Sequence, residues 1–270
     1  MSQLPMDRTR LNAAIANQQP SLILSSQANR EAHIEAADTI DLLYLQFQNA
    51  ILTGSLTLLK TTANITYYVA TTGSDTNDGL SVGSPLKNIQ TAINKLPQII
   101  NHTIIINVAA GTYPETISLN GFMGQGQIII NGATSLAATH NVNDVFVNKV
   151  QIPVNITGFN CASTTSDGFT AIGCGIEVAF AYCRSVQTSV GNGFYVFSSR
   201  VVISGSQVAN RTTGNALLAA ELSFVFSADQ TTGSGNSTGL QAASGSTIRK
   251  SGTQFSGTTA EFAQTGGKIE

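Results

Sequence analysis

Charged residues are scarce in this chain. Only 10% of its 270 residues are Asp, Glu, Lys or Arg, and 13 basic residues nearly balance 15 acidic ones. A protein that binds nucleic acid or an anionic membrane surface needs a basic patch, and this balance does not provide one. We therefore expect no nucleic-acid partner.

Tryptophan is absent, and aromatic residues make up 7% of the chain. Aromatic rings combine a large apolar face with a defined geometry, so their scarcity removes the usual platforms for tight sugar binding. Tyr182 and Tyr195 remain as candidates for sugar stacking, and each can equally be a packing residue.

Cysteines and long apolar runs are also few. Cys161, Cys174 and Cys183 are odd in number and form no CxxC pair, so we expect neither a zinc site nor a disulfide framework, and no cofactor. We interpret the three as small buried apolar residues.

The start, MSQLPMDRTR, has no apolar run of signal-peptide length, and residues 103–110 are too few to span a bilayer, so we expect neither export nor membrane insertion.

Small polar residues occupy the places that charged residues usually take. Gly, Ser, Thr, Asn and Gln favour short strands joined by polar turns, while 42% apolar residues suffice for a core. The fold class that this composition predicts is all-β.

The first 62 residues differ, because they have a helical pattern. We predict helices over residues 7–18 and 26–52, separated by a break at Pro20, and together an α-helical segment at residues 1–62. Its apolar stripe contains His33, Ala36, Ile40, Leu43, Phe47 and Ala50. Such a stripe packs either on its own chain or against sister chains, and in the second case Ile40, Leu43, Phe47 and Ala50 are the oligomerisation contacts.

From residue 127 onward the chain repeats a short unit. Aligned on Gly168, Gly193, Gly214 and Gly239, the units are 25, 21 and 25 residues apart. In each, an apolar pair precedes a corner, and a second strand follows at Ile176, Val201, Leu222 and Thr247. Such a period without helices predicts a β-solenoid whose coils stack about 4.8 Å apart over residues 127–270.

The same spacing leads to two further expectations. Cys161 and Cys183 are 22 residues apart, about one coil, so we predict that they stack. Residues 259–270 repeat the pattern of residues 239–250, so the sequence ends within a coil; we expect another element to cover that end, or the chain to be part of a longer protein.

Residues 63–126 fit a cap and a first coil. Ser84 followed by Pro85 predicts a helix start, and Ile89, Ala92, Ile93 and Leu96 form an apolar face that can lie over the first coil before Pro97 ends the helix. Residues 103–108 then predict the first buried strand.

Three stretches of this region resemble a known family. YYVATTGSDTNDGL, SPLKNIQTAINKLP and IIINVAAGTYPETISL, with the glycine-punctuated coils after them, resemble right-handed parallel β-helix proteins of the pectate-lyase-like superfamily, above all those of bacteriophage tail fibres and tailspikes. The resemblance covers roughly residues 67–270. It implies a right-handed parallel β-helix with an N-terminal capping helix, a homotrimer, and a place in the virion, but no single activity, because the superfamily contains enzymes and non-catalytic adhesins.

Asp75, Asn77 and Asp78 place two carboxylates and an amide within four residues. Oxygen ligands of this kind suit calcium, but their spacing does not match an EF-hand loop, and Asx turns explain the same residues. We interpret them as a structural turn and keep metal binding as the alternative.

Polysaccharide cleavage on a β-helix needs paired carboxylates or an acid with a base. Glu177 and Glu221 are nine and seven residues after their repeat glycines, so they can lie on one wall two coils apart, roughly 10 Å by the sheet spacing. They are the catalytic candidates, and solvated surface carboxylates are the alternative. No arrangement of Ser, His and an acid is recognisable around His102 or His140.

Two functions follow. The first is a structural virion protein, a tail fibre or baseplate-associated protein made in the host cytoplasm without a signal peptide, whose N-terminus attaches to other tail proteins and whose β-helix faces the host. The alternative is a tailspike depolymerase acting on surface polysaccharide. Short turns leave little material for a groove wall, which favours the first.

Overall fold

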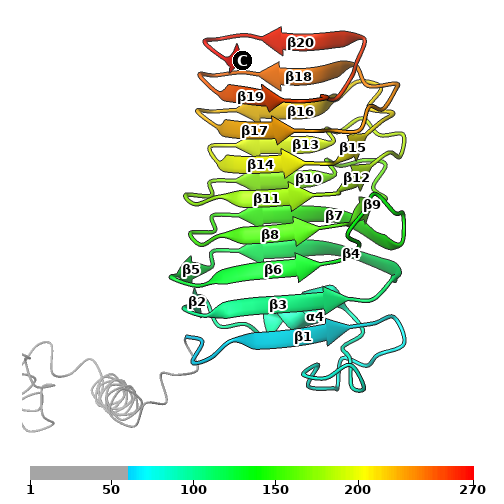
Figure 1. Ribbon diagram of the computed structural model, residues 1–270, viewed down its shortest axis with the longest axis vertical. Coiled ribbons are helices and arrows are strands. Elements are labelled where there is room, and N and C mark those ends of the chain that lie inside the picture. The colour runs from blue at the N-terminus through cyan, green and yellow to red at the C-terminus, as the bar shows by residue number, and fades with distance from the viewer. Residues whose placement is uncertain (1–59) are drawn as a thin grey trace, which may run out of the picture. The chain divides into compact units, whose positions relative to one another are not determined.

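The computed structural model describes residues 60–270, which form a stack of coils (Figure 1). The fold is all-β and consists of a parallel β-solenoid of about seven turns, which confirms the predicted parallel β-helix. The predicted N-terminal helices, with Ile40, Leu43, Phe47 and Ala50, lie outside the described residues. Within the described part, no helix is long and apolar enough to cross a membrane.

Two parallel sheets form the walls. The nine-stranded sheet contains, in spatial order, β1 (Ile65–Val69), β3 (Thr103–Val108), β6 (Gln127–Asn131), β8 (Val154–Thr157), β11 (Val178–Ala181), β14 (Arg200–Ser204), β17 (Phe224–Ala228), β19 (Thr247–Ser251) and β21 (Lys268–Ile269). The ten-stranded sheet contains β15 (Gln207–Val208), β12 (Arg184–Ser185), β9 (Asn160–Cys161), β7 (His140–Asn148), β10 (Phe169–Ile172), β13 (Phe194–Phe197), β16 (Asn215–Ala220), β18 (Thr238–Ala242) and β20 (Thr259–Ala263), with β4 (Gly111–Asn120) joined to β7. Two short strands, β2 (Ile99–Ile100) and β5 (Met123–Gly124), pair separately.

The core is built from side chains that repeat at one position of every coil. In the nine-stranded sheet the register aligns a column of β-branched residues, which are Ile65, Ile104, Ile128, Val154, Val178, Val201, Val225, Ile248 and Ile269. All are buried except the two end members, which pack against the core. Because alternate residues of a strand face opposite sides, each coil extends one continuous apolar interior.

Aromatic rings fill the middle of this interior. Phe169 and Phe194 stack with ring centroids 4.9 Å apart, and Phe180 from the opposite sheet lies 5.4 and 5.8 Å from them. Phe255 extends the stack, 5.7 Å from Phe194. The inner faces of the two sheets therefore contact each other directly.

The register corrects the predicted repeat. Phe169, Phe194, Leu217 and Leu240 are aligned, so the residues before them, Gly168, Gly193, Ala216 and Gly239, share one row. The true spacings are therefore 25, 23 and 23 residues, and Gly214 was the wrong anchor. It lies two residues earlier, in the loop, where a Cβ would meet the backbone of Gly191.

The predicted starts of two second strands were also wrong. Ile176 and Leu222 are exposed, and the strands begin at Val178 and Phe224. Leu222 is part of a corner and has a φ of 59°, outside the extended conformation. The prediction treated two apolar residues of a corner as strand residues. Val201 and Thr247, by contrast, lie within their strands as predicted.

Serines close this corner from the inside. The backbone N–H of Cys174 donates to Oγ of Ser199 at 3.0 Å, that of Ser199 to Ser223 at 3.3 Å, and that of Ser223 to Ser246 at 3.0 Å. A buried N–H without an acceptor is costly, so the hydroxyl ladder satisfies backbone groups that no strand pairs.

Helix α4 (Ile89–Asn94) caps the first coils. Ile89, Ala92, Ile93 and Leu96 are buried, as predicted. The predicted helix start at Ser84 and Pro85 was wrong, because this stretch runs along β1: the Leu86 N–H donates to the Tyr68 carbonyl at 2.9 Å.

A carboxylate that is distant in the sequence caps the N-terminus of α4, where the sequence pattern predicted a local helix start at Ser84. Asn88, the N-cap residue, makes no side-chain cap. Instead the two oxygens of Glu115 accept the N–H groups of Ile89 and Gln90 at 2.7 and 3.0 Å. The negative charge of Glu115 also interacts favourably with the positive, N-terminal end of the helix dipole.

The cysteines are buried and free. This confirms their interpretation as packing residues, and burial raises the pKa of the Cys183 thiol to about 12. The predicted stacking of Cys161 on Cys183 was wrong, because Asn160 pairs with Arg184 and so aligns Cys161 with Ser185.

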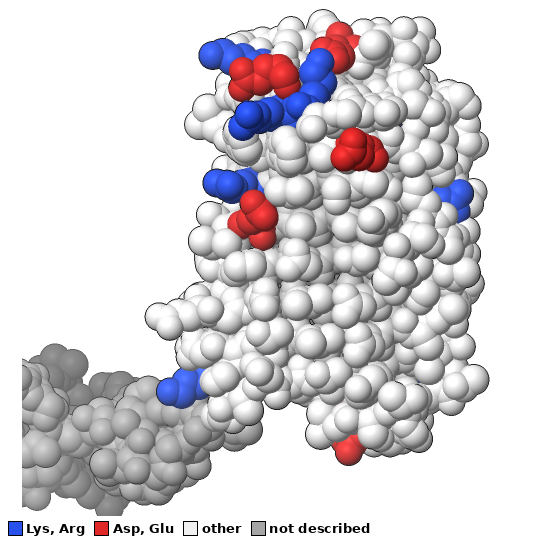
Figure 2. Space-filling view, viewed as in Figure 1, with Lys and Arg blue, Asp and Glu red and all other residues white. Residues whose placement is uncertain are grey.

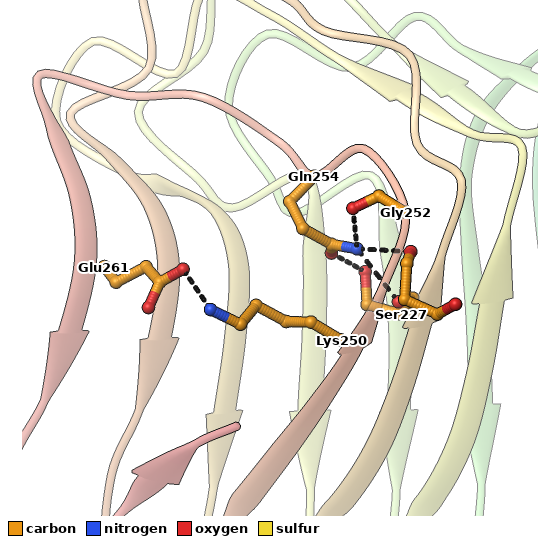
Figure 3. A network of polar contacts seen from close by, with 6 residues as sticks. Ser227, Lys250, Gly252, Gln254 and Glu261 are labelled. Carbon is orange, nitrogen blue, oxygen red and sulfur yellow. Dashed lines mark hydrogen bonds and ion pairs between the residues drawn. The ribbon is translucent and has the colours of Figure 1, made fainter.

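Two inward columns become charged in the last two coils. Lys250 follows Ser227 in one column and Glu261 follows Leu240 in another. Their side chains point toward one another, 2.6 Å apart, while Gln254 binds Ser227 nearby (Figure 3). These two columns therefore end in polar side chains, whereas the column that ends at Ile269 stays apolar, and the five residues of β20 are exposed.

Candidate functional site

The loop around Asp75 holds the capping helix in place. Asp75 Oδ1 accepts the N–H groups of Lys87 and Asn88, each at 3.0 Å, and Oδ2 accepts the Asn88 side-chain amide at 2.6 Å. Slight burial acts to raise the pKa of this carboxyl, but the hydrogen bonds from Asn88 and Lys87 outweigh it, and the pKa is lowered.

Its two neighbours have similar roles. The Asn77 side chain donates to the Pro85 carbonyl at 2.7 Å, and Asp78 Oδ1 accepts the Leu80 N–H at 3.0 Å in an Asx turn. These contacts support the interpretation of Asp75, Asn77 and Asp78 as a structural turn.

Glu177 and Glu221 do not occupy the same position of the coil. Glu177 directly precedes β11, aligned with Arg200 and Phe224, whereas Glu221 directly follows β16 in the corner row of Ser198. The prediction that they lie on one wall two coils apart counted Glu221 from Gly214, which lies two residues before the aligned position. Glu177 instead forms an ion pair with Arg200, Oε2 to Nε 3.5 Å.

A hollow of about 300 Å³ lies on the outer face of the nine-stranded sheet. Its lining is Glu177, Arg200, Val201, Val202, Phe224, Phe226 and Arg249, and we call it the Arg249 hollow. The register explains its composition, because Val202, Phe226 and Arg249 form one outward column over β14, β17 and β19. Charged side chains gather at this end of the stack, while most of the visible surface is uncharged (Figure 2).

One side of the Arg249 hollow is pre-arranged. The Arg200 guanidinium lies over the Phe224 ring, 5.8 Å from its centroid, and Phe224 is 39% exposed. This contact and the ion pair with Glu177 hold Arg200 at the rim. Arg249 is exposed, and within residues 60–270 it has no ion-pair partner.

A second hollow, of about 310 Å³, lies on the ten-stranded sheet. It is lined by Thr116, Asp144, Val145, Phe146, Ser166, Asp167, Thr170, Ile172 and Tyr195, and we call it the Asp167 hollow. Phe146, Thr170 and Tyr195 form its floor, because they share an outward column of β7, β10 and β13.

Both carboxylates of the Asp167 hollow are held by neighbours. Asp144 accepts the Ser166 hydroxyl at 2.9 Å, and Asp167 Oδ1 accepts the backbone and side-chain N–H groups of Asn192. Burial, and then the charges of Asp167 and Glu221, raise the pKa of Tyr195. Tyr195 is therefore a neutral hydroxyl beside two fixed acceptors, a combination that suits the hydroxyl groups of a sugar.

Other reactive groups are enclosed. Burial lowers the pKa of His140, whose Nε2 lies 3.1 Å from the Val108 carbonyl. The Arg211 guanidinium is fully buried, where it donates to Ser185. Among the described residues no three His, Cys, Asp or Glu side chains gather as a metal site would require.

Sequence reasoning missed most of both hollows. Of their lining residues, Phe146, Phe224, Phe226 and Arg249 were not singled out. The alternation of buried and exposed residues along β17 and β19 places Phe226 and Arg249 on the outer face. Only the correct register shows that these two residues are neighbours. Tyr195, one of the two candidates for sugar stacking or packing, lines a hollow, whereas Tyr182 lies at an exposed corner with a φ of 52°.

Comparisons with protein-family models, with curated proteins and with solved structures found no match.

Proposed function

We propose that this chain is a structural virion protein of a bacteriophage tail. In this proposal it is a fibre or baseplate-associated homotrimer, whose N-terminal segment attaches to other tail proteins and whose β-helix projects toward the host surface to bind a receptor, a surface polysaccharide. The observation that carries the proposal is the single apolar core that passes in register from β1 to the last coil. A column of this kind resists bending and can display side chains at fixed spacing.

The alternative, a polysaccharide depolymerase, is favoured by one observation. Asp144 and Asp167 line the same hollow, and glycoside hydrolysis uses two carboxylates. Against it, the Asn192 and Ser166 contacts occupy an oxygen of each carboxylate in a structural role.

The test incubates the full chain with a panel of bacterial capsular and lipopolysaccharide glycans. Retention of a glycan without the appearance of new reducing or unsaturated ends supports attachment. Cleavage that is lost in Asp144→Asn and Asp167→Asn establishes the depolymerase instead.

A further inference from the structure

We propose that the Arg249 hollow binds an acidic saccharide, with Arg249 pairing with the sugar carboxylate and Phe226 packing against the ring. This inference rests on the proposed attachment function, and it specifies the charge of the receptor and the face that binds it.

The charges of the hollow favour an anion. Two guanidinium groups and one carboxylate line it, and that carboxylate, Glu177, is already paired with Arg200. Arg249 thus offers its donors without an internal competitor among the described residues. A guanidinium binds a carboxylate through two parallel hydrogen bonds, which an ammonium group cannot do.

The apolar part of the hollow favours a ring rather than a free anion. Phe224 and Phe226 lie two residues apart on the outer face of β17, and Val202 of β14 is paired with Phe226 in the same outward column. Phe224 is among the exposed large apolar side chains of the described residues, so a ligand can reach its ring. An apolar floor beside a charged rim matches a sugar that presents C–H groups on one face and a carboxylate at its edge.

The strand register keeps the Phe226 ring and the Arg249 guanidinium on neighbouring strands. Phe226 pairs directly with Arg249 across β17 and β19, so their Cα atoms are adjacent in the ladder. Neighbouring strands are about 4.8 Å apart, which is close to the width of a pyranose ring. The site therefore needs no rearrangement to contact a ring and its carboxylate together.

The test measures the affinity of the full chain for alginate, hyaluronate and polysialate, with the carboxyl-reduced derivative of each and dextran as neutral probes. We expect at least one acidic polymer to bind, its reduced derivative to bind at least about ten-fold more weakly, and added salt to weaken the binding. Arg249→Gln should lose about ten-fold in affinity and Arg249→Lys less. The matched control Arg184→Gln changes an arginine of β12, outside the hollow, and should bind as the unaltered chain does.

Equal binding of acidic and reduced polymers, or binding that survives Arg249→Gln, overturns this inference and leaves polysaccharide attachment intact. Failure to bind any of the three acidic polymers also overturns it. The attachment function is then decided separately, by the glycan panel and by the oligomeric state of the chain.

Discussion

Replacing Phe194 by alanine tests the assignment of inward and outward faces on β13. Phe194 is fully buried and contacts Phe169, Phe180 and Phe255, whereas Phe197, on the same strand, faces outward and is partly exposed. Phe197→Ala is therefore a matched control: the same substitution, three residues away, on the opposite face of the sheet.

The expected costs differ several-fold. Loss of a buried phenylalanine and the cavity it leaves cost about 3–5 kcal/mol in the free energy of unfolding. Phe197 loses chiefly its contact with Tyr195, 6.2 Å between centroids, and an aromatic pair contributes at most about 1.5 kcal/mol. With a urea m value on the order of 3 kcal/mol/M, Phe194→Ala lowers the unfolding midpoint by roughly 1 M or more.

The assay is equilibrium urea unfolding of both variants, followed by far-UV circular dichroism and by tyrosine fluorescence so that a two-state transition can be verified. Equal midpoint shifts in the two variants, or a larger shift in Phe197→Ala, would refute the register on which every column in this structure depends.

Two further predictions concern the corners and the cap. Gly158→Ala should cost at least about 1 kcal/mol in thermal or urea unfolding, because Gly158 has a φ of 77° and a Cβ there would strike the Ala133 backbone. The control Gly83→Ala, with open space around it, should change stability by less than about 0.5 kcal/mol, and equal effects would contradict the corner geometry. Because the folded-state pKa of Asp75 lies below its ordinary 3.8, its ionised form stabilises the fold at neutral pH, and this contribution disappears as the pH falls through and below that value. Asp75→Asn should therefore reduce the loss of stability between roughly pH 5 and pH 2, and an unchanged acid-unfolding curve would show that these hydrogen bonds do not stabilise the fold.

Periodicity predicted the fold class because stacking is a local rule applied many times. Each coil needs apolar residues at alternate positions and a polar corner, and both are visible in residues 168–250. The exact register was not predictable from glycine alone. Gly214 and Ala216 both fit a small-residue site, and only the pairing of Phe194 with Leu217 selects the second.

Contacts between distant residues explain the other differences. The cap of α4 comes from Glu115, 26 residues after Ile89, and no local sequence pattern around the helix predicts this contact. Each of the two hollows likewise combines residues from four coils, so a two-residue error in register separates its members. Phe226 and Arg249, which are direct neighbours in the ladder, were for that reason not recognised as a pair.

The most direct test of the account is the mass of the protein in solution, measured by light scattering for the full chain and for residues 60–270, which keep the buried Thr61 and every described coil. The account predicts three chains for the full-length protein and one for the shorter version, because the apolar stripe through Ile40, Leu43 and Phe47 is proposed to hold the sister chains together. A monomeric full chain would contradict the proposal of a trimeric fibre.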